Sequence, residues 1–117
     1  PGGIMLIGEP FWHKVPETEA DAQACGVTSA ADFLTLPELV TSFSELGYDV
    51  VEMVLADQEG WDRYEAAKWL TMRRWLDDNQ DDDFASEVRN ELKTAPKRHV
   101  TWTREYFGWG VFALMSR

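Results

Sequence analysis

A carboxylate and an ammonium group lie three residues apart within a run of aromatic residues. Residues 61–76 read WDRYEAAKWLTMRRWL, and a helical wheel gathers their apolar side chains into an arc of roughly 140°. The arc contains Trp61, Tyr64, Trp69, Met72, Trp75 and Leu76. Glu65 and Lys68 project into the same arc, where residues at this spacing are neighbours. Two interpretations stay open: a salt bridge at the margin of a core, or polar groups in the aromatic wall of a pocket.

The remaining residues that could take part in catalysis do not form a recognisable catalytic site. Glu9 and Glu65 are candidates for a general base, although each also has a structural interpretation. His13 and His99 lie far apart, and no H-x-x-x-H or C-x-x-C spacing occurs, so no metal site is predicted. Cys25 stands at a predicted helix end, where the helix dipole raises a thiol pKa, which disfavours a nucleophile.

An acidic run at residues 77–83, DDNQDDD, is the remaining candidate for ion binding. A calcium loop needs a glycine-enabled turn and a bidentate glutamate at fixed offsets, and the run has neither. A solvated connector that ends in a helix cap explains the same residues more simply. We therefore expect no calcium site.

Length and charge limit the class of protein. The chain has 117 residues, of which 44% are hydrophobic, so we expect one globular domain over residues 1–117. A net charge of −10 argues against a nucleic-acid partner. No apolar stretch approaches the ~18 residues of a membrane span, and no basic leader precedes an apolar segment. The single Cys25 excludes an internal disulfide and is compatible with a cytoplasmic location, which we expect.

Hydrophobic patterns predict alternating strands and helices. Residues 4–7 form an apolar run typical of a strand buried on both faces, ended by Gly8 and Pro10. A weak helix is predicted over residues 16–25. Thr35 and Glu38 form a capping box before a helix that stops at Gly47. Residues 48–56 predict a strand with one buried face, and residues 110–115 a central strand. The aromatic helix at 61–76 and a helix over 84–95, ended before Pro96, lie between them.

Four stretches together resemble a known family. PGGIMLIGEPFW, LGYDVVEMVLAD, GWDRYEAAKW and TREYFGWGVFALMSR resemble the C-terminal half of class I S-adenosylmethionine-dependent methyltransferases of the small-molecule type, in which a Pro-Gly-Gly turn leads into the fifth strand. The turn matches Pro1, Gly2 and Gly3. The resemblance covers essentially the whole chain. It implies an α/β fold, the C-terminal part of a Rossmann-like methyltransferase sheet, in which residues 48–56 are the sixth strand.

The same resemblance implies how the strands are arranged. Residues 110–115 would be the seventh strand, inserted antiparallel between residues 4–7 and 48–56 in a mixed three-stranded sheet. An unpaired edge would remain beside residues 4–7, which favours self-association of an isolated fragment. The segment between the sixth and seventh strands would be a family-specific insertion near the substrate.

The cofactor site of the family is missing from these residues. S-adenosylmethionine is held in that family by a glycine-rich loop after the first strand and an acidic residue ending the second, and neither pattern occurs in the chain. We therefore expect a fragment that provides the sheet edge and part of the acceptor pocket, with the cofactor bound by a missing N-terminal half. The isolated chain is expected to be inactive. The residues expected to bind a small-molecule acceptor are Glu9, Trp12, Trp61, Tyr64, Glu65 and Lys68.

One alternative belongs to a different class. A stand-alone acidic domain that binds a small molecule or a protein, without catalysis, would use the same aromatic face. The two hypotheses differ in whether the reading frame continues upstream of Pro1 into a strand and a glycine-rich loop. Neither the acceptor, nor the methylated atom, nor the catalytic residues can be named from the sequence.

Overall fold

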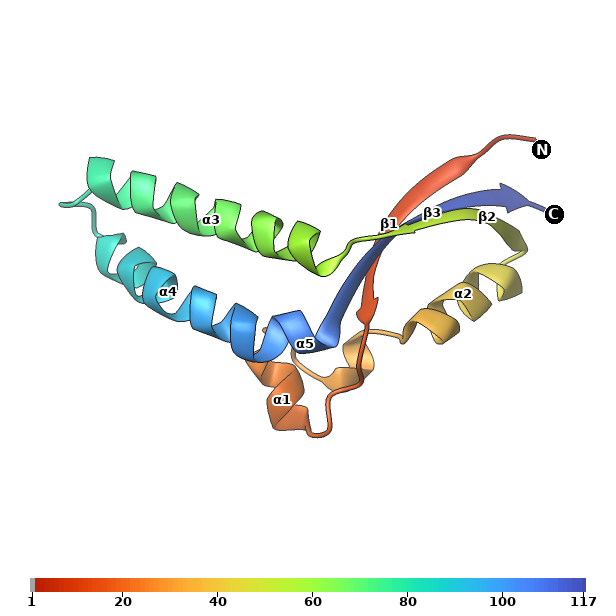
Figure 1. Ribbon diagram of the computed structural model, residues 1–117, viewed down its shortest axis with the longest axis horizontal. Helices are drawn as coiled ribbons and strands as arrows, with labels where there is room; N and C mark the ends of the chain where they lie inside the picture. The colour runs from red at the N-terminus through yellow and green to blue at the C-terminus, as the bar shows by residue number, and fades with distance from the viewer. Residues whose placement is uncertain (1) are drawn as a thin grey trace.

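A computed structural model describes residues 2–117 of the protein. Its main parts are a three-stranded sheet and a helical hairpin (Figure 1). The sheet has the order β1-β3-β2, formed by β1 (Met5–Trp12), β3 (Phe107–Ser116) and β2 (Tyr48–Leu55). Both pairings are antiparallel, so β1 and β2 run parallel to each other without touching. The predicted central, antiparallel last strand is confirmed. Pro1 of the predicted opening turn lies outside the described residues.

The main core lies between the sheet and α2 (Leu36–Glu45). Phe112 and Leu114 of β3 are almost fully buried there, and they pack with Phe11, Leu39 and Phe43. The capping box predicted for α2 is present, since the Thr35 side chain accepts from the backbone of Glu38. Gly47 ends the helix at a φ of 93°, a conformation that glycine adopts without strain. This helix and its stop are therefore confirmed.

Strand β1 is longer than the sequence predicted. It continues through Pro10 to Trp12, although proline cannot donate to a strand ladder. The backbone N–H of Trp12 bonds to Leu34 on the side of β1 away from β3. Pro10 has the same parity, so its nitrogen also faces away from β3. The expected strand end at Gly8 and Pro10 was wrong because Pro10 sits on an edge strand, where no ladder bond is lost.

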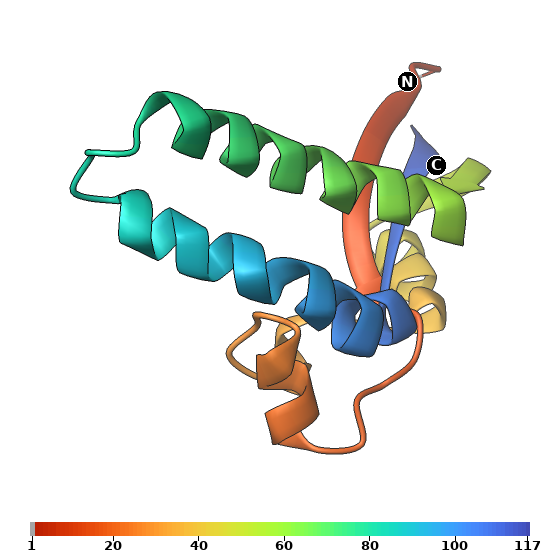
Figure 2. The ribbon, with the colours of Figure 1, turned by 60° about the vertical axis from the view of Figure 1, so that its left-hand side comes forward.

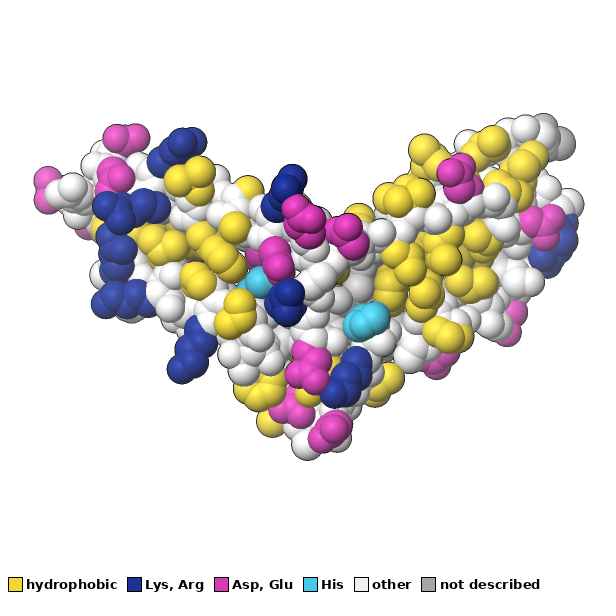
Figure 3. All heavy atoms as spheres, in the orientation of Figure 1, with side chains coloured by type: hydrophobic (Ala, Val, Ile, Leu, Met, Phe, Trp, Pro, Cys, Tyr) yellow, Lys and Arg dark blue, Asp and Glu magenta, His cyan; other side chains and the backbone are white. Residues whose placement is uncertain are grey.

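The start of β1 is exposed rather than buried on both faces. Ile4 and Leu6 are 64% and 71% exposed, which corrects the prediction of a strand covered on both sides. Figure 3 shows apolar side chains gathered over the sheet. Further exposed apolar residues on the strands are Met5, Val51, Met53, Val54, Leu55, Trp109 and Val111. Within residues 2–117, α2 covers one face of the sheet only in part, and no helix covers the other face near these residues.

Two long helices form a hairpin that projects from the sheet (Figure 2). They are α3 (Gln58–Asp78) and α4 (Ala85–Arg98), which contain the predicted aromatic helix and its successor. Asp57 caps α3 by accepting from the backbone of Gly60 at 2.7 Å. The hairpin makes the molecule elongated, with extents of 56 × 33 × 25 Å. None of the helices described is long and apolar enough to cross a membrane.

The sequence predicted that α4 ends before Pro96, and this prediction was wrong. Pro96 lies inside the helix, which runs on into a π-helical turn (His99–Thr103) and the short α5 (Arg104–Tyr106). Proline removes one backbone hydrogen bond and normally kinks or breaks a helix, but the helical path continues past Pro96. The short helices α1 (Glu19–Ala24) and η1 (Ala30–Asp32) lie on the same side as this turn.

Candidate functional site

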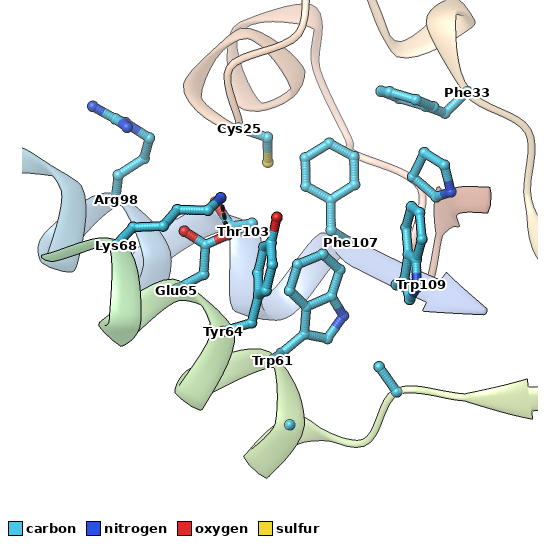
Figure 4. A pocket seen from close by; sticks show the side chains of 13 residues that line it. Cys25, Phe33, Trp61, Tyr64, Glu65, Lys68, Arg98, Thr103, Phe107 and Trp109 are labelled. Atoms are coloured by element: carbon cyan, nitrogen blue, oxygen red, sulfur yellow. Dashed lines mark hydrogen bonds and ion pairs between the residues drawn. The ribbon is translucent and has the colours of Figure 1, made fainter. Parts of the chain in front are cut away.

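A cavity of about 670 Å³ lies between α3, the π-helical turn and the start of β3 (Figure 4). This volume is within the range usual for small-molecule sites. Five of the thirteen lining residues are aromatic, and a small group of charged side chains lies at one end. The wall is formed by Pro10, Cys25, Phe33, Ala56, Gly60, Trp61, Tyr64, Glu65, Lys68, Arg98, Thr103, Phe107 and Trp109.

The sheet topology explains why the cavity is at this edge. Strands β1 and β2 are both antiparallel to β3, so their carboxyl ends lie at the same edge of the sheet. Pro10 comes from the end of β1 and Ala56 directly follows β2. The first residues of β3, Phe107 and Trp109, start from that edge. Open α/β sheets bind their ligands outside the carboxyl ends of their strands.

Four of the six predicted acceptor-binding residues lie in the wall. Trp61, Tyr64, Glu65 and Lys68 come from successive turns of α3. Lys68 Nζ lies 3.2 Å from a carboxylate oxygen of Glu65 and 4.4 Å from the ring centre of Tyr64. The Glu65 side chain is 19% exposed and that of Lys68 is 49% exposed. Glu65 and Lys68 therefore form an ion pair and also border the cavity, so features of both interpretations are present.

The structure does not bring Glu9 and Trp12 into the wall. Glu9 pairs with Gly110 and has the same parity as Phe11, so it lies on the face of the sheet toward α2. Trp12 is 3% exposed and lies behind the wall, where it stacks on Phe107 with ring centres 4.7 Å apart. Its indole Nε1 donates to the carbonyl oxygen of Ala30 at 2.7 Å. Trp12 therefore supports the wall rather than lining it.

Several lining residues were not predicted, because they come from segments distant in sequence. Phe33 and Cys25 reach the cavity from the loops around α1 and η1, whereas Thr103 lies on the π-helical turn. Trp109 was within reach of sequence reasoning. A side chain at Gly8 would meet the Trp109 ring at 2.6 Å, so the ring lies over the glycine. A glycine paired near a tryptophan on adjacent strands is a signal of such an arrangement.

Two groups in this region have unusual surroundings: the thiol of Cys25 and the indole nitrogen of Trp61. Burial, together with the nearby charge of Asp21, raises the pKa of the Cys25 thiol to about 11, so Cys25 contributes a neutral thiol. This agrees with the expectation that it is not a nucleophile. The Nε1 atom of Trp61 is buried without a hydrogen-bond partner among residues 2–117.

A polar cluster joins α3 to the π-helical turn. Nε2 of the buried His99 lies 2.8 Å from Oδ1 of Asp62, and Nε of Arg104 lies 3.2 Å from the same atom. The hydrogen bond from His99 is the main reason why the pKa of Asp62 lies below its ordinary value. The ring of His99 also packs edge-on to Trp69. The cluster thus fixes the distance between the two elements that form one end of the cavity.

Replacing Asp62 with Ala should lower the melting temperature at neutral pH. The depressed pKa of Asp62 means that its contribution to stability is present above the unfolded value of about 4 and is lost as the pH falls through the folded value. The difference between the variant and the unchanged protein should therefore shrink when thermal unfolding is repeated at about pH 3. Asp77→Ala is the matched control, since Asp77 pairs with the exposed Arg73. Equal losses in both variants would contradict the role given to the cluster.

Residues that could bind a metal are not grouped in the part of the chain from Gly2 to Arg117. No three His, Cys, Asp or Glu side chains meet there in a geometry that could hold an ion. His13 and His99, in particular, are not brought together: His99 is 3% exposed in its cluster, and His13 is exposed.

Comparisons with known proteins agree closely with this fold. A crystal structure of a SAM-dependent methyltransferase from Geobacter sulfurreducens in complex with S-adenosyl-L-homocysteine matches the whole chain at 68% identity and a TM-score of 0.96. A SAM-dependent methyltransferase from Thiobacillus denitrificans, in complex with the same compound, matches at 68% identity and 0.95. Over its whole length, the chain is similar in sequence and fold to the C-terminal half of these SAM-dependent methyltransferases.

The match to these methyltransferases covers only part of them. The chain corresponds to 47% of each of the two proteins just named. It is also 76% identical to the uncharacterized protein YjhP of Escherichia coli K12, over 47% of that protein, and the crystal structure of YjhP gives a TM-score of 0.96. The chain thus spans about half the length of its relatives. No known family description matches it.

The methyltransferase cofactor does not fit the residues described. Between Gly2 and Arg117, no glycine-rich turn leads from a strand into a helix. Gly108 and Gly110 lie within β3, where they make room for Phe11 and Leu55. Such a turn is what presents backbone N–H groups to a nucleotide in Rossmann-like folds. Residues 2–117 therefore contain no turn of the kind that binds the nucleotide part of such a cofactor.

Proposed function

We propose that this chain is the acceptor-binding half of a methyltransferase that uses S-adenosylmethionine to methylate a small molecule. The observation that carries the proposal is the aromatic cavity at the carboxyl ends of β1 and β2. It lies where open α/β sheets bind ligands, in a chain that matches methyltransferases over its whole length. The class I, small-molecule type is part of this proposal.

The residues of the cavity suit methyl transfer, which depends mainly on alignment. Bound S-adenosylmethionine supplies the reactive methyl group, and the protein holds the acceptor in line with it. The rings of Trp61, Phe107 and Trp109 would orient the acceptor and exclude water. Among residues 2–117, Glu65 is the single carboxylate in the wall. It is therefore the residue that could accept a proton from the attacking hydroxyl or amine of the acceptor.

The partner expected for the open sheet is the N-terminal half that the relatives possess. Apart from the bridge at Trp12, strand β1 is paired on one side only among residues 2–117, and the exposed apolar residues of this segment include Ile4 and Leu6. An unpaired edge next to an apolar face is a site for further strands and helices. Self-association of the isolated chain through this edge stays a prediction, and so does a cytoplasmic location. The alternative of a stand-alone binding domain receives no support from the relatives.

The full-length protein, meaning this chain together with the N-terminal half of its relatives, should bind S-adenosylmethionine, and the chain alone should not. The reason is that residues 2–117 provide the acceptor cavity and no nucleotide-binding turn. Calorimetric titration of both proteins checks the expectation. Saturable, micromolar binding by the 117-residue chain alone would contradict the assignment of cofactor binding to the N-terminal half. Absence of binding by the full-length protein would contradict the proposed function.

A further inference from the structure

The cavity has two chemically different ends (Figure 4). Phe107, Trp61 and Trp109 form one end, together with Phe33. At the other end, Glu65, Lys68 and Arg98 supply the charges. A ligand that satisfies both ends must have an apolar body and a polar or charged group.

The aromatic end is built to receive a flat ring. Phe107 is stacked on Trp12 with an angle of 8° between the rings, so one of its faces is already covered. Phe33 stands edge-on to Phe107 with the ring centres 5.4 Å apart. Phe107 is thus fixed from behind and from the side, while its remaining surface borders the cavity. A rigid ring of this kind binds another aromatic ring with little loss of conformational entropy.

The charged end favours an anion over a cation. Lys68 already occupies the position over the Tyr64 ring that an ammonium group of a ligand would seek. The ammonium of Lys68 has three N–H donors, and one of them is used by Glu65. The guanidinium of Arg98 has five donors, of which two bond to Glu91. The charged lining residues are two cations, Lys68 and Arg98, and one carboxylate, Glu65, so their net charge is +1, and an anionic group finds unused donors on both cations.

We infer that the acceptor is an aromatic molecule that carries an anionic group such as a carboxylate, and that Lys68 determines this specificity. The ring would lie against Phe107 between Trp61 and Trp109, with the anionic group toward Lys68. The inference rests on the proposed function of the cavity as the acceptor site. It goes further in naming the class of acceptor and the residue that selects it.

Three probes that share one ring system test the inference on the full-length protein. They are 2-naphthoate, 2-naphthamide and 2-naphthylmethylamine, which are anionic, neutral and cationic. Calorimetric titration should give about tenfold tighter binding of 2-naphthoate than of 2-naphthamide, equivalent to about 1.4 kcal/mol. The cationic probe should bind most weakly.

Variants of Lys68 separate the charge from the shape of the site. Lys68→Met should reduce the preference for 2-naphthoate to less than about threefold, and Lys68→Arg should keep most of it. Lys97→Met is the control, because Lys97 is exposed on α4 and does not line the cavity. Equal binding of the three probes, tighter binding of the amine, or an unchanged preference in Lys68→Met would overturn the inference. None of these titrations uses S-adenosylmethionine, so failure to bind that compound would count against the proposed function alone.

Discussion

Replacing Phe112 with Ala should lower the free energy of unfolding of the full-length protein by about 3–5 kcal/mol. Phe112 is 0% exposed and lies on the central strand β3. Its ring contacts Phe43 with the ring centres 5.2 Å apart. The substitution removes buried apolar surface and leaves a cavity between the sheet and α2, and both effects are unfavourable.

Urea unfolding measures this loss, with Phe84→Ala as the control. Phe84 is 62% exposed at the start of α4, so the same chemical change there should cost less than about 0.5 kcal/mol. A loss of less than about 1 kcal/mol for Phe112→Ala would mean that β3 is not the centre of the core.

Replacing Glu65 with Gln should reduce turnover of the full-length protein by about 100-fold or more while the protein stays folded. General-base catalysis contributes roughly 10² to 10⁴ to rates, and glutamine cannot accept the proton. The free energy of unfolding should change by less than about 1 kcal/mol, because the pair with Lys68 is partly exposed. Turnover is measured as release of S-adenosyl-L-homocysteine with an aromatic hydroxy acid that the unchanged protein methylates.

Glu59→Gln is the matched control on the same helix. Glu59 forms an exposed ion pair with Arg63 and does not line the cavity, so turnover should stay within about twofold. Full activity of Glu65→Gln would remove Glu65 from the mechanism. A fall in turnover accompanied by a large fall in stability would assign Glu65 a structural role instead.

The antiparallel arrangement of the sheet was predicted from the resemblance to methyltransferases. The central position of β3 was also predicted from the apolar run at residues 110–115. The strand boundaries were less accurate. The rule that proline ends a strand predicts an end at Pro10. This rule does not take into account on which side of the strand its neighbour lies. Similarly, Pro96 lies inside α4, although local rules end a helix before a proline.

The cavity could be predicted only on the side that one helix provides. Trp61, Tyr64, Glu65 and Lys68 share a face of α3, and helical periodicity places them together. The opposite wall combines residues from loops and from β3, such as Phe33 and Phe107, and no periodicity relates them. Glu9 was misplaced by an argument of sequence proximity alone. It follows the predicted strand end, but the strand continues and turns Glu9 toward α2.

The position of β3 in the sheet also has a consequence for synthesis. Strand β2 is made before β3, which is its neighbour in the sheet of residues 2–117. The α3–α4 hairpin must also be made before that neighbour emerges. During this interval β2 exposes apolar side chains and an unpaired backbone, a state prone to aggregation.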